Sequence, residues 1–304
     1  MTKFTKIYKK ELFKIKRGID VGNYSLKEYP NTNIKSLVSL EENILGSKLH
    51  LEYENKHYYI GEGNFETELN KSNKENFLPL LLTGIALNSN KDDIFMQIVV
   101  GLPINQFKAN KHSLENLILS SRVREIKLNN INRKIIISDF KVYPEAIGAY
   151  YSLDSQEDVI IVDLGGRTTD VAYIVNKKVV TSSTIAVGTL NIYKDIADKL
   201  NSEYGLDLGL PEAERIIEKG FLEIDGLKIS LSFVTDILKR NFMKINDDLT
   251  IKYPIRTEKI VLVGGGSVLF KQAFKNRYNN SSVADNHIFA NSIGFLKVAK
   301  ELWS

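Results

Sequence analysis

The sequence predicts an α/β protein built from two similar domains with a cleft between them. Three observations support this fold. Two strand–aspartate–glycine hairpins, at residues 15–27 and 159–174, each open a stretch in which strand-like and helix-like runs alternate. A further strand, at residues 260–263, ends in three glycines. A cleft between two related domains requires an internal repeat of this kind.

The first hairpin begins with a strand expected over residues 15–19. After it come, in order, Asp20, Gly22, Asn23, Tyr24, Ser25 and Lys27. The glycine permits a tight turn, and the hydroxyl groups that follow are hydrogen-bond donors. Taken singly, Asp20 could cap a turn and Lys27 could be an exposed lysine on an edge strand.

The second hairpin begins with the β-branched, apolar run 159–162, which is typical of a central strand. Because Gly165 and Gly166 carry no side chain, backbone N–H groups of the turn can approach an anion, and Thr168 and Thr169 add hydroxyl donors. Asp163 would repel a bare phosphate, so a divalent cation between the two is expected. Alone, the segment could also be an ordinary tight hairpin.

The third segment is a strand followed by Gly264, Gly265, Gly266 and Ser267, and then by a helix-compatible run over 268–274. A flat ring could lie against such a backbone. Together, the two strand–aspartate–glycine hairpins and the late strand with three glycines indicate one kind of fold far more specifically than any one of them does alone.

The rest of the chain shows an α/β rhythm. Strands are expected at 35–40, 49–53, 57–60, 94–100, 125–128 and 134–137, and helices at 76–87, 105–120, 190–201, 211–219 and 233–244, with a hairpin through Asp225 and Gly226. Each half of the chain therefore opens with one of the two glycine hairpins.

These motifs resemble those of the actin, sugar kinase and DnaK superfamily. The segments GIDVGNYSLK, VVGLP, YPEAIGAYY, DLGGRTTDVAYI and LVGGGSVLF are similar to those of prokaryotic actin-like proteins of the plasmid-segregation type, the ParM group. The run 290–295 resembles the small-residue helix that links the two halves of such proteins. The resemblance implies an actin-like, ribonuclease H-like duplicated fold with a nucleotide in the interdomain cleft. Domain I would be 1–152, domain II 153–286, and the helix in 287–304 would pack on domain I.

The resemblance also implies cofactors, namely ATP, with GTP not excluded, and Mg²⁺. The triphosphate would lie between the two hairpins, near residues 22–25, 165–168 and 264–267. The ion would be held, through waters, by Asp20 and Asp163, and Lys27 would neutralise phosphate charge. The activity expected is magnesium-dependent ATP hydrolysis.

Hydrolysis needs a group that orients and partly deprotonates water. Glu145 is the candidate, because Pro144 and the small residues after it would place its carboxylate in a first helical turn facing the cleft. A glutamate of ParM-like proteins polarises the attacking water at the corresponding position. The alternative is a glutamate favoured there only by the helix dipole. Glu214 and Arg215 resemble the charged helix beside the base, but such pairs are usually solvated.

Composition agrees with a cytoplasmic two-domain protein. The chain has 304 residues, no cysteine and a net charge of +4 from 41 basic and 37 acidic residues, which does not by itself indicate DNA binding. The length favours a minimal actin core. The four histidines show no ligand spacing, so no metal other than magnesium is expected. Residues 1–17 are basic and could form an amphipathic segment on a membrane, although a solvated leader is favoured.

Three functions remain open at this stage. The favoured one is an ATPase that assembles head to tail into filaments and moves plasmid or other DNA cargo through a DNA-bound adaptor of the ParR type, without binding nucleic acid itself. The second is a small-molecule kinase of the same fold, in which Glu145 activates a substrate hydroxyl. The third is a membrane-associated scaffold of the MreB or FtsA sort.

Overall fold

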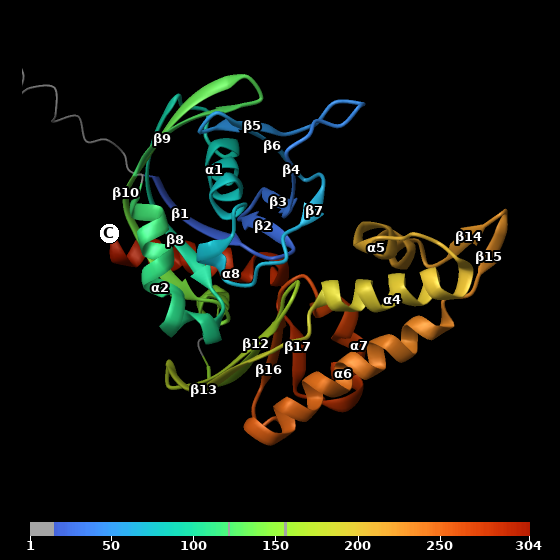
Figure 1. Cartoon of the computed structure of the whole chain (residues 1–304). Helices are drawn as coiled ribbons and strands as arrows, with labels where there is room; N and C mark the ends of the chain where they lie inside the picture. The colour runs from blue at the N-terminus through green and yellow to red at the C-terminus, as the bar shows by residue number, and fades with distance from the viewer. Residues whose placement is uncertain (1–14, 121, 155–156) are drawn as a thin grey trace, which may run out of the picture.

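The computed structural model describes residues 15–120, 122–154 and 157–304. Its strands form a ten-stranded sheet, a five-stranded sheet and a separate two-stranded hairpin (Figure 1). The large sheet has the order β3-β2-β1-β8-β10-β9-β5-β6-β4-β7, and the smaller one β13-β12-β11-β16-β17. The two sheets form separate halves of the molecule.

The strands of the large sheet are β1 (Ile15–Val21), β2 (Ser25–Glu28), β3 (Thr32–Lys35), β4 (Leu37–Ser39), β5 (His50–Tyr53), β6 (Lys56–Ile60), β7 (Asn64–Phe65), β8 (Asp93–Leu102), β9 (Val123–Leu128) and β10 (Ile131–Pro144). Those of the smaller sheet are β11 (Val159–Leu164), β12 (Thr169–Val175), β13 (Lys178–Ile185), β16 (Ile260–Val263) and β17 (Ser281–Val283), while β14 (Leu222–Ile224) and β15 (Leu227–Ile229) form the hairpin.

The helices are α1 (Phe77–Leu87), α2 (Ile104–Leu119), α3 (Ile147–Ser152), α4 (Thr189–Tyr204), α5 (Leu210–Lys219), α6 (Ser232–Lys252), α7 (Ser267–Arg277) and α8 (Ala290–Leu302), with short 3₁₀ turns η2 (Lys71–Asn73) and η3 (His287–Phe289).

The two sheets share a central plan, which confirms the duplicated α/β fold. In the first, the antiparallel hairpin of β1 and β2 lies beside β8, and β8 pairs in parallel with both β1 and β10. In the second, the antiparallel hairpin of β11 and β12 lies beside β16, which pairs in parallel with β11 and β17. Each glycine hairpin therefore occupies the same place in its sheet.

Burial explains why these elements form. Strand β8 is buried from Ile94 onward except at Phe95, as expected for a strand covered on both faces. Helix α1 packs on this sheet and is apolar almost all round, so nine of its eleven residues are buried. Each fully buried leucine contributes roughly 2 kcal/mol of transfer free energy.

Helix α8 packs on β1, β8 and α3, although it is the last helix of the chain. The contact depends on glycine, because a Cβ on Gly294 would lie 1.7 Å from the Gly148 carbonyl oxygen. The Phe295 ring fills the space beside Gly101 and Gly148. The chain therefore returns to the first half at its end, while the proposed domain boundaries stay a prediction.

Two local expectations are wrong. Strand β10 continues to Pro144, because it pairs with β8 from Lys134 to Pro144, and α3 begins only at Ile147. Glu145 therefore lies between strand and helix, not in a first helical turn. The expected strand at 35–40 is split at Ser36, since β3 and β4 pair with different neighbours.

The predicted basic amphipathic segment lies almost wholly outside the described residues. Within the described part of the chain, no helix combines the length and the apolar character that crossing a membrane requires.

Candidate nucleotide-binding site

The two hairpin aspartates lie at corresponding places in the two sheets. Asp20 is in β1 and Asp163 in β11, and both side chains are buried. Asp20 is directly opposite Lys27 in the hairpin register, and the Lys27 Nζ donates to the Asp20 carboxylate over 3.3 Å. The antiparallel pairing of β1 and β2 thus brings Asp20 and Lys27 together from seven positions apart.

Lys27 keeps its positive charge although it is buried. Burial alone would lower its pKa, but the carboxylates of Asp20 and Asp163 outweigh this effect and raise the pKa of Lys27 above its usual value. A permanently charged ammonium group therefore lies between two carboxylates that come from different sheets.

Glu145 follows the end of β10 and lies near Asp20 and Asp163. It accepts a hydrogen bond from Lys71 of η2. The Lys71 side chain is 1% exposed, donates to the Gly101 carbonyl over 3.3 Å and lies 3.9 Å from Asp20 Oδ1. Burial raises the pKa of Glu145 to about 7, although the Lys71 charge opposes the shift. A carboxylate that titrates near neutrality can act as a general base.

Asp163 is held by Asn291 of α8. The Asn291 Nδ2 donates to Asp163 over 2.6 Å, and its Oδ1 accepts from the backbone N–H groups of Ala146 and Ala149 over 3.2 and 3.1 Å. Ala146, the residue after Glu145, has a φ of 60°, which is unusual for a residue with a side chain. One amide therefore connects Asp163 with the segment that carries Glu145.

A second carboxyl group faces Asp163 across the hairpin. Asp170 of β12 is its direct partner in the antiparallel register, is buried, and accepts a hydrogen bond from the Thr184 hydroxyl. Burial and then the charge of Glu145 raise the pKa of Asp170 well above its usual value. Of these two aspartates, Asp163 was predicted as a site residue from the sequence, and Asp170 was not.

The balance of charge fits a divalent cation. Burial raises the pKa of Asp163, and the neighbouring charge of Asp20 adds to this. The same two causes act on Glu145. Buried carboxyl groups whose pKa is raised by burial and by a neighbouring carboxylate are stabilised in their charged form by a further cation, and Mg²⁺ bound through water would supply that charge. The chemistry of the donor set therefore suits the expected ion.

The cations Lys71, Lys74 and Arg167 lie near one another, and such a group can bind an anion. Lys74 donates to Asn23 Oδ1 over 2.5 Å, and burial, together with the charges of Lys71 and Arg167, lowers the pKa of Lys74 to about 8. A bound phosphate would relieve this repulsion between cations. Neither Lys71 nor Lys74 was predicted, because both lie in a polar stretch that reads as a solvated loop.

The glycine turns let three backbone segments approach closely. Gly264 has a φ of 82°, and a Cβ there would lie 2.4 Å from Asp163 Oδ1. A Cβ on Gly166 would lie 2.6 Å from the Tyr24 Cβ, and one on Gly188 would lie 2.5 Å from the backbone of Gly166. Gly166 is therefore required where the second hairpin touches the first.

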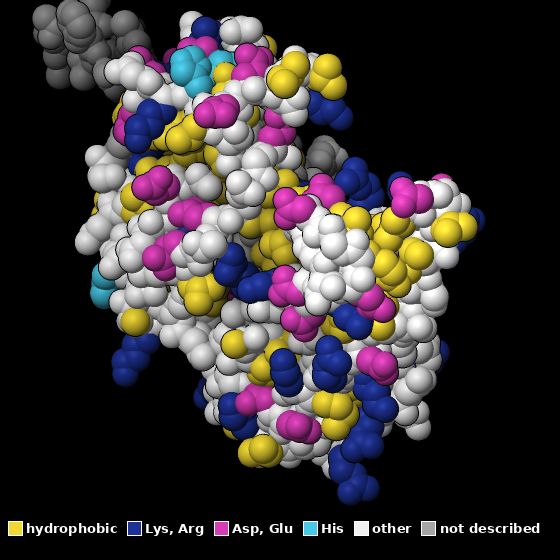
Figure 2. Space-filling model, turned by 45° about the vertical axis from the view of Figure 1, so that its right-hand side comes forward, with side chains coloured by type: hydrophobic (Ala, Val, Ile, Leu, Met, Phe, Trp, Pro, Cys, Tyr) yellow, Lys and Arg dark blue, Asp and Glu magenta, His cyan; other side chains and the backbone are white. Residues whose placement is uncertain are grey.

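These segments enclose a cavity of about 320 Å³ that residues of both halves line. Of the predicted residues, its lining includes Tyr24, Ser25, Lys27, Gly165, Gly166, Glu214, Gly265 and Gly266. The lining also contains residues that were not predicted, among them Asn33, Thr189, Tyr193 and Ile217. In Figure 2, hydrophobic side chains are visible in the hollow between the two halves, and acidic and basic groups are intermixed around it.

Several predicted donors have other partners. The Gly165 N–H donates to the Thr168 carbonyl over 2.9 Å, and the Thr169 hydroxyl donates to the Val187 carbonyl over 2.7 Å. Arg167 donates to the Glu66 carbonyl over 3.1 Å. In each case the donor that was expected to face a phosphate instead binds a backbone carbonyl of the protein.

Ser267 and Tyr24 also have other partners. The Ser267 hydroxyl donates to the Gly264 carbonyl over 2.8 Å. The Tyr24 hydroxyl donates to Glu214, and its ring stacks on Phe65 with centroids 5.6 Å apart, so Tyr24 forms a wall of the cavity instead of facing a phosphate.

Glu214 and Arg215, the predicted pair on α5, lie in different environments. Glu214 is buried and accepts from both Tyr24 and Lys35 of the other half. Arg215 points to solvent, with a side chain that is 61% exposed and paired with Glu212. One helical position is a rotation of roughly 100°, so neighbours on a helix cannot share a face. Arg215 therefore does not reach the cavity.

Comparisons with known proteins agree with this geometry. A sequence model described as the N-terminal domain of actin-like proteins matches residues 18–148, and one described as MreB/Mbl protein matches residues 87–226. No curated protein sequence matches the chain.

Solved structures share the fold over nearly the whole chain. The subunit of a 15-stranded ParM filament from Clostridium botulinum has 24% identity and a TM-score of 0.80, covering 95% of this chain and 99% of that one. An archaeal actin homologue in complex with ADP has 18% identity and a TM-score of 0.76, covering 94% and 99%. The apo psk41 ParM protein has 19% identity and a TM-score of 0.66, covering 94% and 97%. The chain therefore has the fold of prokaryotic actin-like proteins such as ParM, and residues 18–148 match the N-terminal domain of actin-like proteins.

Proposed function

We propose that this protein binds ATP with Mg²⁺ in the cleft, hydrolyses it, and assembles head to tail into filaments that segregate plasmid or other DNA through a DNA-binding adaptor of the ParR type. The observation that carries the proposal is the convergence of Asp20, Lys27, Glu145 and Asp163 on one buried site between two sheets. The ParM filament from Clostridium botulinum, with a similar fold, supports the assembly.

Each group has a role that its surroundings support. Asp20 and Asp163 would hold the ion, and Lys27 and Lys74 would neutralise phosphate charge. Bound magnesium would supply charge stabilisation to the phosphate oxygens. Glu145 accepts a hydrogen bond from the attacking water and takes up its proton, while Lys71 holds the carboxylate in place.

The base of the nucleotide fits the part of the cavity that Tyr24, Tyr193 and Glu214 border. The archaeal homologue with bound ADP supports an adenine nucleotide, and GTP remains the alternative. A membrane-associated scaffold is the second candidate function, favoured by the match of residues 87–226 to MreB/Mbl protein. A small-molecule kinase would need a substrate hydroxyl in place of water beside Glu145.

The test of the proposed function is light scattering together with electron microscopy of the purified full chain. We expect filaments with ATP and magnesium, and none without nucleotide. Scattering that stays at baseline under all nucleotide conditions would contradict the assembly. Phosphorylation of a sugar panel without polymer would favour the kinase.

Replacing Asp20 or Asp163 by alanine should weaken nucleotide binding in magnesium by roughly tenfold or more, because one carboxylate is lost from the shell of the ion. Binding in excess chelator should change much less. Fluorescence titration with a labelled nucleotide measures both conditions. Asp92→Ala, whose side chain is 90% exposed, is the matched control. Equal losses with and without magnesium would assign these aspartates to the fold alone.

Removing residues 1–12 should leave nucleotide binding and assembly intact, because the first described strand begins at Ile15. Co-sedimentation with anionic vesicles distinguishes the scaffold alternative. We expect little vesicle binding by the intact chain. Strong binding that falls with salt and disappears on truncation would move the function towards a membrane scaffold.

A further inference from the structure

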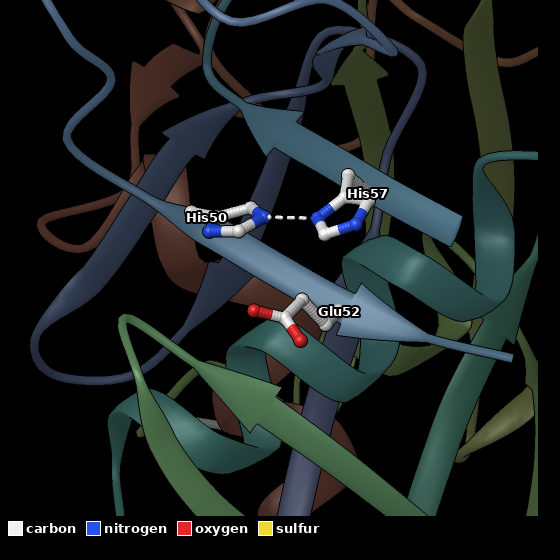
Figure 3. Close-up of side chains that lie close together, drawn as sticks. All are labelled: His50, Glu52 and His57. Carbon is white, nitrogen blue, oxygen red and sulfur yellow. Dashed lines mark hydrogen bonds between the residues drawn. The ribbon is translucent and has the colours of Figure 1, made fainter. Parts of the chain in front are cut away.

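A second group of potential ligands lies outside the cleft, on the hairpin of β5 and β6. His50 and Glu52 are two positions apart on β5 and therefore share a face of the strand. His57 on β6 is the direct partner of Glu52 in the antiparallel register. The ligand atoms of the three side chains lie within 4.8 Å of one another (Figure 3).

The four histidines show no ligand spacing in the sequence, yet the fold brings His50 and His57 together. Residues seven positions apart are separated by about 10 Å on a helix and by more than about 20 Å along one strand, too far to share an ion. A tight hairpin, however, turns the chain back and places His57 diagonally across from His50.

The two imidazole rings point at each other. His50 Nε2 and His57 Nδ1 are 2.8 Å apart, so one nitrogen donates a proton and the other offers its lone pair. If the donating ring carries its proton on its other nitrogen instead, the lone pairs of both facing nitrogens are directed at the space between the rings. A metal ion can take the place of the proton.

The geometry needs little adjustment. Tetrahedral Zn²⁺ with bonds of about 2.1 Å separates two ligand nitrogens by roughly 3.4 Å, so the two nitrogens must part by about 0.6 Å. His50 is partly buried and its ring packs against Tyr59, with centroids 4.9 Å apart, while His57 is exposed. One ring is thus held by packing and the other can adapt.

Glu52 supplies the third donor and is itself supported. The hydrogen bond from Lys127 lowers the pKa of Glu52, so the group is a carboxylate at neutral pH. Lys127 donates to Oε1 over 2.9 Å, which leaves Oε2 for an ion. The solvent side of this sheet face can admit water as a fourth ligand.

We propose that His50, Glu52 and His57 form a binding site for a divalent transition-metal ion, with Zn²⁺ as the ion that two imidazoles and a carboxylate suit best. Mg²⁺ and Ca²⁺ prefer oxygen ligands and fit this donor set poorly. The site shares no residue with the nucleotide cleft. A bound ion would tie β5 to β6 and stabilise the first half of the chain by mass action.

The test is titration of the chelator-treated full chain with Zn²⁺ by calorimetry, in excess Mg²⁺ and without nucleotide. We expect one ion per chain, and a cobalt-substituted sample should show the visible absorption of a four-coordinate site. His50→Ala and His57→Ala should each weaken Zn²⁺ binding roughly 100-fold, and Glu52→Gln roughly tenfold. Zinc should also raise the melting temperature of the wild type, and much less that of the His50 and His57 variants.

Two control variants separate this site from nonspecific binding. His112→Ala removes a histidine whose side chain is 86% exposed and also adjoins a glutamate, and it should leave zinc affinity unchanged. Lys127→Met removes a competing cation from Glu52, so zinc should bind as tightly or more tightly. Wild-type stoichiometry well below one ion per chain, or unchanged affinity in both the His50 and the His57 variants, would overturn the proposal.

Discussion

Replacing Glu145 by glutamine is expected to slow phosphate release from bound ATP by roughly 10²-fold or more, with nucleotide affinity retained. Glutamine keeps the size of the side chain and can still accept a hydrogen bond from Lys71, so the local packing survives. It cannot take up a proton from water. A single-turnover assay of phosphate release measures the effect, and filaments of the variant should outlast those of the wild type.

Two further variants sharpen this test. Glu115→Gln changes a half-buried glutamate on α2 that pairs with Lys111, and it should leave hydrolysis unchanged. Lys71→Met removes the cation that opposes the rise in the pKa of Glu145, so the carboxyl group should stay protonated to higher pH. Hydrolysis by that variant should therefore fall most at neutral pH and partly recover in alkaline buffer. Wild-type rates in Glu145→Gln would remove Glu145 from the chemistry.

Replacing Gly294 by alanine should destabilise the protein by about 3 kcal/mol or more. In an exposed helix the same change stabilises by up to about 1 kcal/mol, so the expected sign is reversed. The reason is that the new methyl group would lie 1.7 Å from the Gly148 carbonyl oxygen and 2.6 Å from its carbon, both of them backbone atoms. Helix α8 would have to move away from α3. Urea denaturation of the nucleotide-free protein measures the loss.

The matched control is Gly84→Ala in α1. The three atoms nearest to a Cβ there all belong to the Leu26 side chain, the first at 3.2 Å, so a shift of a few tenths of an ångström would relieve the contact. We expect a change of less than about 1 kcal/mol. Similar denaturation midpoints for Gly294→Ala and the wild type would show that α3 and α8 separate more easily than this packing implies.

Local pattern was sufficient to predict the fold and the two hairpins. Asp20 and Lys27 lie in one short hairpin, so their neighbourhood follows from residues seven positions apart. The same is true of Asp163 and its glycines. The hydrophobic periodicity also located α1 and α2 to within one residue at each end.

Contacts between distant segments could not be predicted. Lys71 reaches Glu145 across 74 positions, and Asn291 reaches Asp163 across 128. No spacing rule connects such residues, because their proximity depends on how α8 and η2 pack on the sheets. The prediction for Arg215 is wrong for a local reason. The orientation of α5 about its axis decides which of the adjacent residues Glu214 and Arg215 is buried.

Asn291 has a consequence for the proposed hydrolysis. Its amide is a rigid plane, with the nitrogen on Asp163 and the oxygen on the backbone next to Glu145. In the proposed mechanism, a movement of Asp163 towards a cation would draw this amide, and the peptide at Ala146 with it. The position of Glu145 would then depend on whether the cation is in place. A subunit with nucleotide but without its metal would conserve the nucleotide, without any lid that opens or closes.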